Sequence, residues 1–363
     1  MSAHTHDRPA PPPPGGAPDD LSTQPLGHPT FIYLGLRPRP VNFYDGRMPS
    51  EDPVGSNTQE PASRGLPAFA APSSIISVVT DDGVSLSVRM SGSTTSPVIV
   101  FVHGFPDDAH VWSMVTAALA GEARLVTYDV RGAGSSGAPA DRQAYALDRL
   151  AADLRQVIDA VSPDQRVHLV AHDWGSIQAF RALRTTLAGR VTSYTSIAGP
   201  DLDHVRQWQR QQLRGGPAGW WRLARQSIAS AYIGAFLLPG PVDLATRLGI
   251  VGRLVNRDPS RLGTRVSRAD IRHGLNLYRA NLYRAKVRGG AHARAYGPVD
   301  VPVQVIVPSG DRYVGPGLQT ELQDWVRDLS VVTMDGGHWL MLSHPTEVAD
   351  RIRVFVTDTE KRA

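Results

Sequence analysis

The sequence contains no cysteine, almost no lysine and no long run of apolar residues. Without cysteine, disulfides, thiolate metal sites and a cysteine nucleophile are all excluded. The lack of disulfides fits a reducing cytoplasm, where we expect the protein to work. Only Lys286 and Lys361 are lysines among the 38 basic residues, so arginine carries the basic charge. No stretch of about 18 apolar residues is available to cross a membrane. A basic segment followed by an apolar one, typical of a secretory signal, is also missing from the start.

The sequence does contain enough apolar residues for a large core. Hydrophobic residues make up 41% of the 363, and this length allows one large domain or two ordinary ones. The formal charge of +4 is small for such a chain. The preference for arginine accompanies abundant alanine and glycine, which indicates a coding bias rather than phosphate binding. We therefore predict no nucleic-acid partner.

The first 72 residues differ from the rest of the chain. They hold 15 of the 29 prolines, including "PAPPPPGGAP", and only short apolar runs. Such a segment cannot bury enough surface to offset the entropy of ordering it. We predict a largely disordered N-terminal extension over residues 1–72, whether it serves as a flexible arm, a partner-binding tail or upstream sequence from a misassigned start.

Strand-like and helical segments alternate over residues 73–200 and again over 298–363. "SIISVVT", "DDG" and "VSLSVRM" predict a β-hairpin. Apolar runs such as "PVIVFVHG" and "RVHLVAHD" then alternate with helical patterns, which indicates a parallel sheet with helices on both faces. The helical patterns predict helices near Ala109–Ala120, Ala146–Val161, Leu318–Arg327 and Thr346–Thr357. Residues 201–297 interrupt this core without any strand-like run, so we expect them to form a helical cap over the strand ends.

Three predicted strand ends carry a nucleophile, an acid and a base. Asp173 lies at the centre of "AHDWGS", a small–x–nucleophile–x–small turn between a strand and a helix in which Ser usually stands. Asp311 follows "VQVIVPSG", and His338 follows "VVTMDGG". This order along the chain is that of the hydrolases built around such an elbow. Ser176 lies one helical turn beyond the tip, where we expect its hydroxyl to face packing or backbone.

Alternatives remain for these carboxylates. An Asp after a strand is often only a helix N-cap, and Asp201 or Asp203, after the next strand, are alternative acids. The segment "FVHGFPDD" supplies the other expected part, since backbone N–H groups of Phe105 and Trp174 would form an oxyanion hole. Pro106 fits a tight turn with a cis bond. We interpret His103 and His172 as buried hydrogen-bonding residues.

The motifs "HGFPD", "YDVRGAGSSG", "AHDWGS", "VPSGD" and "GGHWLMLSHPTEV" resemble those of the soluble, microsomal-type epoxide hydrolases of the α/β-hydrolase superfamily. The similarity extends over about 75–356 and is greatest to the hydrolase half of mycobacterial two-domain epoxide hydrolase–dehydrogenases. It implies a mostly parallel eight-stranded sheet with an inserted helical cap, and no cofactor or metal. It also implies an alkyl ester on Asp173, hydrolysed by water that His338 activates with Asp311 as its partner. No dehydrogenase activity is implied.

The family uses two cap tyrosines to protonate the epoxide oxygen. Tyr232 in "SAYIGAFLLPG" and Tyr278 in "LNLYR" resemble them, with Tyr283 as the fallback for the second. A buried cap tyrosine is otherwise a packing residue with a hydrogen-bonded hydroxyl. Haloalkane dehalogenases share the Asp elbow but need N–H donors for a halide, which Trp174 with Trp208, Trp220 or Trp221 could supply. A third alternative is a hydrolase-fold protein that binds a ligand without turnover.

The expected partners are a small lipophilic epoxide and water. We predict an apolar pocket that includes Phe105, Pro106, Trp174, Phe236, Leu237 and Trp339. Residues 201–297 hold 17 Lys and Arg against 5 Asp and Glu. This charge is either an ordinary solvated surface or a face that docks on anionic lipid. The sequence leaves a monomer and a homodimer equally open.

Overall fold

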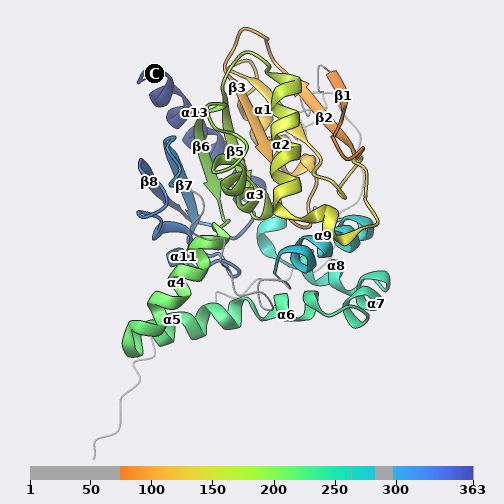
Figure 1. The fold of residues 1–363 in the computed structure, drawn as a ribbon, viewed down its shortest axis with the longest axis vertical. Coiled ribbons are helices and arrows are strands. Elements are labelled where there is room, and N and C mark those ends of the chain that lie inside the picture. The colour runs from red at the N-terminus through yellow and green to blue at the C-terminus, as the bar shows by residue number, and fades with distance from the viewer. Residues whose placement is uncertain (1–73, 263, 283–296, 363) are drawn as a thin grey trace, which may run out of the picture. The chain divides into compact units, whose positions relative to one another are not determined.

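The computed structural model describes residues 74–262, 264–282 and 297–362. Its centre is an eight-stranded sheet in the order β1-β2-β4-β3-β5-β6-β7-β8 (Figure 1). β2 runs antiparallel to both of its neighbours, and the other neighbouring pairs are parallel. The strands are β1 (Ser74–Val79), β2 (Ser85–Ser91), β3 (Val98–Val102), β4 (Arg124–Tyr128), β5 (Val167–His172), β6 (Val191–Ile197), β7 (Val303–Pro308) and β8 (Leu329–Met334). The predicted hairpin and mostly parallel sheet are therefore confirmed.

Helices cover both faces of the sheet. In β3, Val98, Val100 and Val102 pack into the apolar cluster that contains α2 (Leu147–Val161) and α3 (Trp174–Leu183). The alternate residues, Ile99 and Phe101, pack with α1 (Ser113–Ala118) and α13 (Pro345–Glu360) instead. Because successive side chains of a strand point to opposite faces, a central strand covered on both sides has to be apolar throughout. This explains the uninterrupted "VIVFV" run.

An all-helical segment lies between β6 and β7, where the sequence predicts the cap. Its described elements are α4 (Leu202–Arg214), α5 (Gly216–Ala229), α6 (Ala231–Leu237), α7 (Pro241–Arg247), α8 (Ile250–Val255), the 3-10 helix η3 (Pro259–Arg261) and α9 (Arg268–Asn281). We call these elements the helical insertion. It lies beyond the carboxyl ends of the central strands (Figure 1). No helix within the described ranges is both long and apolar enough to span a bilayer.

Most of the predicted helices are found close to their expected bounds. The helix expected near Ala109–Ala120 is divided into the 3-10 helix η1 (Ala109–Trp112) and α1. The remaining short elements are the 3-10 helix η2 (Arg142–Tyr145), α11 (Pro316–Thr320) and α12 (Leu340–Ser343). The predicted extension over residues 1–72 and the fallback Tyr283 lie outside the described residues.

The helix predicted over Leu318–Arg327 is wrong, because α11 already ends at Thr320. The chain beyond it pairs with the segment before β7 instead. Val299 donates its N–H to the carbonyl of Trp325 at 2.8 Å, and the N–H of Arg327 returns a bond to the carbonyl of Val299 at 3.2 Å. These long-range bonds, which no local pattern reveals, replace the expected helical ones.

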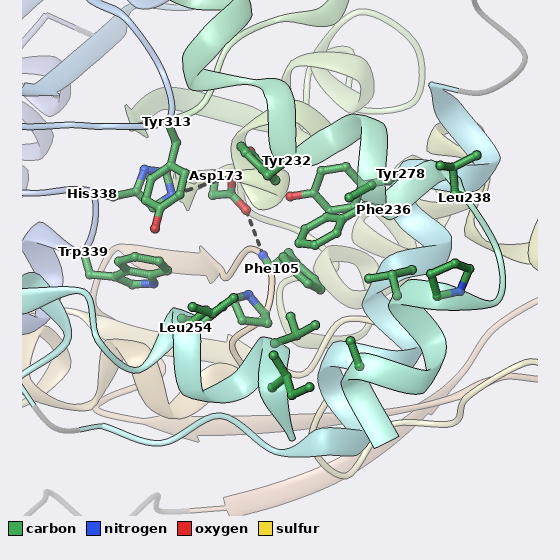
Figure 2. Close-up of a pocket in the computed structure, with 18 residues that line it drawn as sticks. Phe105, Asp173, Tyr232, Phe236, Leu238, Leu254, Tyr278, Tyr313, His338 and Trp339 are labelled. Carbon is green, nitrogen blue, oxygen red and sulfur yellow. Dashed lines mark hydrogen bonds and ion pairs between the residues drawn. The ribbon is translucent and has the colours of Figure 1, made fainter. Parts of the chain in front are cut away.

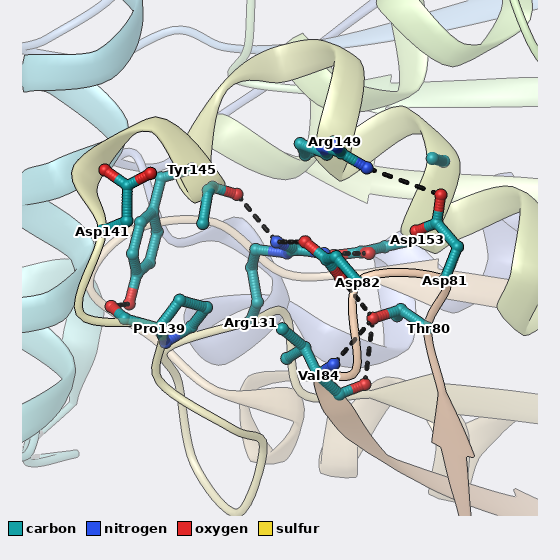
Figure 3. Close-up of polar contacts among 12 residues, drawn as sticks. Thr80, Asp81, Asp82, Val84, Arg131, Pro139, Asp141, Tyr145, Arg149 and Asp153 are labelled. Atoms are coloured by element: carbon teal, nitrogen blue, oxygen red, sulfur yellow. Dashed lines mark hydrogen bonds and ion pairs between the residues drawn. The ribbon is translucent and has the colours of Figure 1, made fainter.

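A buried ion-pair network fixes the loop after β4 to the rest of the core (Figure 3). The side chain of Arg131 is fully buried and donates to both carboxylate oxygens of Asp153 on α2. It also donates to Asp82 in the turn between β1 and β2, with one N···O distance of 2.8 Å, and to the carbonyl of Ala144 at 2.8 Å. One arginine thus joins three segments that are distant in sequence.

We predict that Arg131→Met lowers the free energy of unfolding by about 3–5 kcal/mol, because Asp153 is left buried without its counter-charge. Urea unfolding followed by circular dichroism measures this change. Arg149→Met is the matched control, since its ion pair with Asp81 joins side chains that are 50% and 60% exposed. That control should change the free energy by less than about 1 kcal/mol. Equal losses in the two variants would contradict the role assigned to Arg131.

Candidate active site

Asp173 occupies a sharp turn between β5 and α3, as the elbow pattern predicts. Its backbone has φ 51° and ψ −120°, a region that residues with a side chain rarely adopt. Small neighbours permit the turn. A β carbon on Gly104 would lie 2.6 Å from Oδ2 of Asp173, and one on Gly199 would lie 2.5 Å from its carbonyl oxygen. Strained non-glycine residues of this kind cluster at functional sites.

The carboxylate of Asp173 is buried but hydrogen-bonded. The backbone N–H of Phe105 donates to Oδ2 at 2.9 Å, and the N–H of Trp174 donates to the same carboxylate. The peptide bond between Phe105 and Pro106 is cis, in agreement with the tight turn expected there. Burial raises the pKa of Asp173 to about 6, against the lowering effects of His338 and the two amides. The two amides predicted for an oxyanion hole therefore both donate to this side chain.

His338 lies between the two predicted carboxylates. Its Nε2 is 3.7 Å from Oδ1 of Asp173, and its Nδ1 is 3.0 Å from Oδ2 of Asp311. The other oxygen of Asp311 accepts the backbone N–H groups of Tyr313 and Val314. Burial opposes a charge on the ring, but Asp311 and Asp173 outweigh it and raise the pKa of His338 to about 9. The structure thus brings the three residues together, with His338 between the two carboxylates.

The residues that we interpreted from the sequence as structural, and those offered as alternative acids, have other partners. Ser176 is fully buried and donates to the carbonyl of Ala171 at 2.8 Å. His103 accepts the N–H of Val130, and His172 contacts the carbonyl oxygen of His338. The two alternative acids, Asp201 and Asp203, both pair with the buried side chain of Arg184, which follows the last residue of α3.

Two tyrosines from the helical insertion face Asp173. Tyr232 comes from α6 and Tyr278 from α9, and their ring centroids are 6.3 Å apart. Their hydroxyls share a hydrogen bond, and the side chain of Trp174 also bonds to Tyr278. Burial, together with the charge of Asp173, raises the pKa of both hydroxyls above the usual tyrosine range. Both therefore keep their protons near neutral pH.

These residues line one end of a cavity of about 500 Å³ (Figure 2). The predicted lining residues Phe105, Pro106, Phe236 and Trp339 are found there. Leu237 and Trp174, which were also predicted, do not line the cavity. Leu237 points into the apolar core, and its neighbour Leu238 lines the cavity instead. Trp174 lies behind Tyr278, in T-shaped contact at 4.9 Å between ring centroids.

The other residues that line the cavity were not predicted from the sequence. Tyr313 packs edge-on against His338 at 5.0 Å between ring centroids, and its place two residues after Asp311 was a usable signal. The far end of the cavity is formed by α7 and α8, whose short apolar helices carry no chemical motif. The lining residues there are Pro241, Val242, Ala245, Ile250, Val251, Leu254 and Val255.

The tryptophans of the helical insertion do not reach the cavity. Trp208 is buried against Val314 and Leu318, whereas Trp220 and Trp221 are 55% and 72% exposed. None of the three is among the residues that line the cavity. α4 and α5, which carry them, extend away from α7 and α8 (Figure 1).

A second buried ion pair connects the insertion to both loops of the site. Asp107, two residues beyond Phe105, accepts from Arg261 of η3 at 2.7 Å and from the indole N–H of Trp339 at 2.7 Å. The guanidinium of Arg261 also stacks on Trp339, 4.6 Å from the ring centroid. This contact fixes the loop that carries Phe105 relative to the loop that carries His338. Within the described ranges, no group of three or more His, Asp or Glu side chains is arranged to hold a metal ion.

Comparison with known proteins relates this arrangement to one family. Residues 97–345 match the family described as "alpha/beta hydrolase fold". "Probable oxidoreductase EphD" of Mycobacterium tuberculosis is 35% identical over 289 residues, which cover 77% of this chain and 48% of that protein. "Epoxide hydrolase A" of Mycobacterium tuberculosis is 28% identical and matches 78% of this chain and 98% of its own length. The chain thus spans about half the length of the EphD proteins.

Solved structures share the fold. A structure described under "Novel epoxide hydrolases belonging to the alpha/beta hydrolases superfamily in metagenomes from hot environments" aligns with a TM-score of 0.64 at 23% identity. The alignment covers 78% of this chain and 98% of that one. Bacillus megaterium epoxide hydrolase in complex with an inhibitor aligns with a TM-score of 0.60 at 22% identity, covering 78% and 100%. At these identities the likeness establishes the fold.

We predict that Asp311→Asn brings the pKa of His338 well below about 9. Removing the partner charge leaves burial, which disfavours the protonated ring. NMR titration of ring-labelled histidine measures this pKa. Asp201→Asn is the control, since Asp201 pairs with Arg184 and should leave the titration of His338 unchanged. A shift produced by Asp201→Asn instead would identify that residue as the partner acid.

Proposed function

Since this chain belongs to the alpha/beta hydrolase fold family, we propose that it is an epoxide hydrolase that converts a lipophilic epoxide into a vicinal diol. The observation that carries the proposal is the pairing of a carboxylate nucleophile with two protonated tyrosines across one cavity. The similarity to "Epoxide hydrolase A" over nearly that protein's whole length supports it. The oxidoreductase name of the EphD relatives is not carried over, because this chain spans about half of them.

In the first step Asp173 is the nucleophile. Its Oδ2 accepts the amide of Phe105, so we assign the attack to Oδ1. A bond forms between Oδ1 and an epoxide carbon while the bond from that carbon to the epoxide oxygen breaks. Tyr232 or Tyr278 donates a proton to the leaving oxygen, since an alkoxide is too basic to leave unaided. The product of this step is an alkyl ester on Asp173.

In the second step His338 removes a proton from water, and the resulting hydroxide attacks the carbonyl carbon of the ester. Negative charge then develops on Oδ2, which already accepts the amide of Phe105, and the amide of Trp174 donates to the same carboxyl group. Each such donor contributes roughly 10²–10³ in rate in other enzymes. Collapse of this intermediate breaks the bond between the carbonyl carbon and the alkyl oxygen, and His338 returns its proton to that oxygen as the diol leaves. The carboxyl group left on Asp173 then gives up its proton, which restores the tyrosine that lost one in the first step. Esterification also removes the Asp173 charge, which favours the neutral form of His338 that the step requires.

The remaining parts of the assignment follow from the same geometry. We propose that residues 73–200 and 298–363 form the hydrolase core and that the helical insertion is its cap, since the insertion supplies Tyr232 and Tyr278. The apolar side chains of α7 and α8 suit a lipophilic substrate. The absence of cysteine supports a reducing compartment such as the cytoplasm.

Haloalkane dehalogenation is the weaker alternative. A halide needs N–H donors beside the nucleophile, and the indole of Trp174 is already bonded to Tyr278. The predicted substitutes Trp208, Trp220 and Trp221 are not among the residues that line the cavity. The tyrosine pair has a direct use only where an oxygen must be protonated. These contacts favour the epoxide.

We predict that His338→Gln accumulates the ester on Asp173, because water is no longer activated while the nucleophile remains. Intact-protein mass spectrometry after incubation with a lipophilic epoxide should show a gain equal to the whole epoxide. Peptide mapping should locate the gain to Asp173. Asp173→Asn with His338→Gln is the control and should show no adduct.

A parallel incubation with a bromoalkane separates the alternatives. An alkyl gain without bromine would assign the chain to the dehalogenases. No adduct from either compound in a folded protein would favour a ligand-binding role. Either result would overturn the proposed reaction.

We predict that Tyr232→Phe with Tyr278→Phe slows formation of the ester by about 10²–10⁴, the usual contribution of a positioned acid. Single-turnover mass spectrometry in the His338→Gln background measures this rate directly. Tyr145→Phe is the matched control, because this buried tyrosine donates to the carbonyl of Pro139, in a loop of the core. Unchanged ester formation in the double variant would mean that other groups protonate the oxygen.

A further inference from the structure

Three of the apolar residues that line the active-site cavity, on or next to α6 and α8, are exposed. Leu238, Ile250 and Leu254 all line the cavity, yet they are 61%, 43% and 59% exposed to solvent. They therefore form the edge of the opening. Figure 2 shows Leu238 at the opposite end of the cavity from His338. A substrate that enters past these residues contacts aliphatic side chains before it reaches the polar groups of the active site.

The apolar edge continues onto the outer surface of α7. Leu244 and Leu248 are 57% and 55% exposed and do not line the cavity. Together with Leu238, Ile250 and Leu254 they form what we call the mouth surface. Five large aliphatic side chains exposed along one short stretch of chain are unusual on a soluble surface and mark an interaction site. α7 lies at the edge of the molecule farthest from α13 (Figure 1).

Four exposed arginines lie on or next to the elements that carry the mouth surface. Arg247, Arg253, Arg257 and Arg268 are exposed, and Arg268 reaches back to the carbonyl of Arg247. The ion pairs found in the described part of the chain include none of these four. The two acids of the same stretch are engaged: Asp243 pairs with Arg279, and Asp258 binds Ser260. The surface thus combines exposed aliphatic groups with uncompensated positive charge.

We propose that the mouth surface docks on an anionic lipid bilayer, so that an epoxide on an aliphatic chain passes from the membrane into the cavity. Aliphatic side chains enter the boundary of the acyl chains, and arginines beside them bind anionic headgroups. A second copy of this chain fits less well. In a two-fold contact the same patch meets itself, which would bring the arginines of both copies together. Lipid phosphate instead neutralises them.

The docking places a restriction on the substrate, and this part rests on the proposed function. Apart from Asp173 and His338, the described residues that line the cavity include no acidic or basic side chain. The end toward the mouth is formed by aliphatic groups of α7 and α8. The chain attached to the epoxide is therefore an uncharged hydrocarbon that extends back toward the bilayer.

Vesicle co-sedimentation tests the docking without any substrate. Wild-type protein should sediment with vesicles of equal parts phosphatidylcholine and phosphatidylglycerol, and much less with phosphatidylcholine alone. Leu244→Glu with Leu248→Glu should weaken binding to the anionic vesicles at least about tenfold, because two aliphatic side chains that would contact the bilayer become charged. Arg253→Gln with Arg257→Gln should weaken it about 25-fold, at roughly fivefold per arginine.

Val354→Glu is the matched control, since Val354 on α13 is 57% exposed and lies outside the helical insertion. It should sediment like the wild type, and thermal unfolding should show that every variant is folded. Equal sedimentation with both vesicle types would overturn the electrostatic part of the proposal. Wild-type binding in the leucine variant would overturn the mouth surface as the contact. Concentration-dependent dimers that the leucine variant abolishes, without vesicle binding, would assign the surface to self-association.

A second readout separates docking from catalysis. Binding to vesicles is scored on the protein alone, so a failed epoxide assignment leaves that result standing. If the enzyme is active, Leu244→Glu with Leu248→Glu should lower kcat/KM for a long-chain epoxide presented in anionic vesicles. The ratio of this value to that for a short water-soluble epoxide should fall at least about tenfold, in line with the lost partitioning. An unchanged ratio would show that the substrate does not arrive through the mouth surface.

Discussion

The burial of one carboxylate, Asp173, is the constraint on which the rest of the site depends. A carboxylate removed from water is stable only if donors and a compensating charge surround it. The amides of Phe105 and Trp174 supply the donors, and His338 supplies the charge. Each of these groups has to be held in place by further contacts. Asp311 therefore binds His338, and the pair of Asp107 and Arg261 joins the two loops that carry them.

The same constraint explains why the helical insertion and the core form one functional unit. Tyr232, Tyr278 and Arg261 come from the insertion, whereas their partners come from the ends of the strands. The insertion also closes the cavity over Asp173, and this burial raises the pKa of the carboxyl to about 6. The proposed nucleophile, its proposed acid and their shield from solvent thus depend on a single packing arrangement. Exposed apolar side chains on and next to α6 and α8 border the cavity that this arrangement leaves.

Local patterns were enough for the parts of the fold that rest on local chemistry. The apolar run of β3, the turn of the first hairpin and the 3.6-residue periodicity of α2 each follow from short-range rules. The helix expected over Leu318–Arg327 failed because Val299, distant in sequence, pairs with that segment. The same limit applies to Leu237 and Leu238. One packs in the core and the other lines the cavity, and only the orientation of α6 decides which.

The sequence by itself determined the groups of the proposed chemistry: a carboxylate in an elbow turn, a histidine and an acid after later strands, and, through the family resemblance, two tyrosines in a helical segment. The first three could be placed together because parallel strands bring their carboxyl ends to one edge of a sheet. The tertiary structure alone decided what surrounds that chemistry. It turned Tyr313 toward His338, kept Trp208, Trp220 and Trp221 out of the cavity, and joined Asp107 to Arg261. The physical reason is that these contacts depend on how separate helices pack against the strand ends, and residue spacing carries no information about that packing.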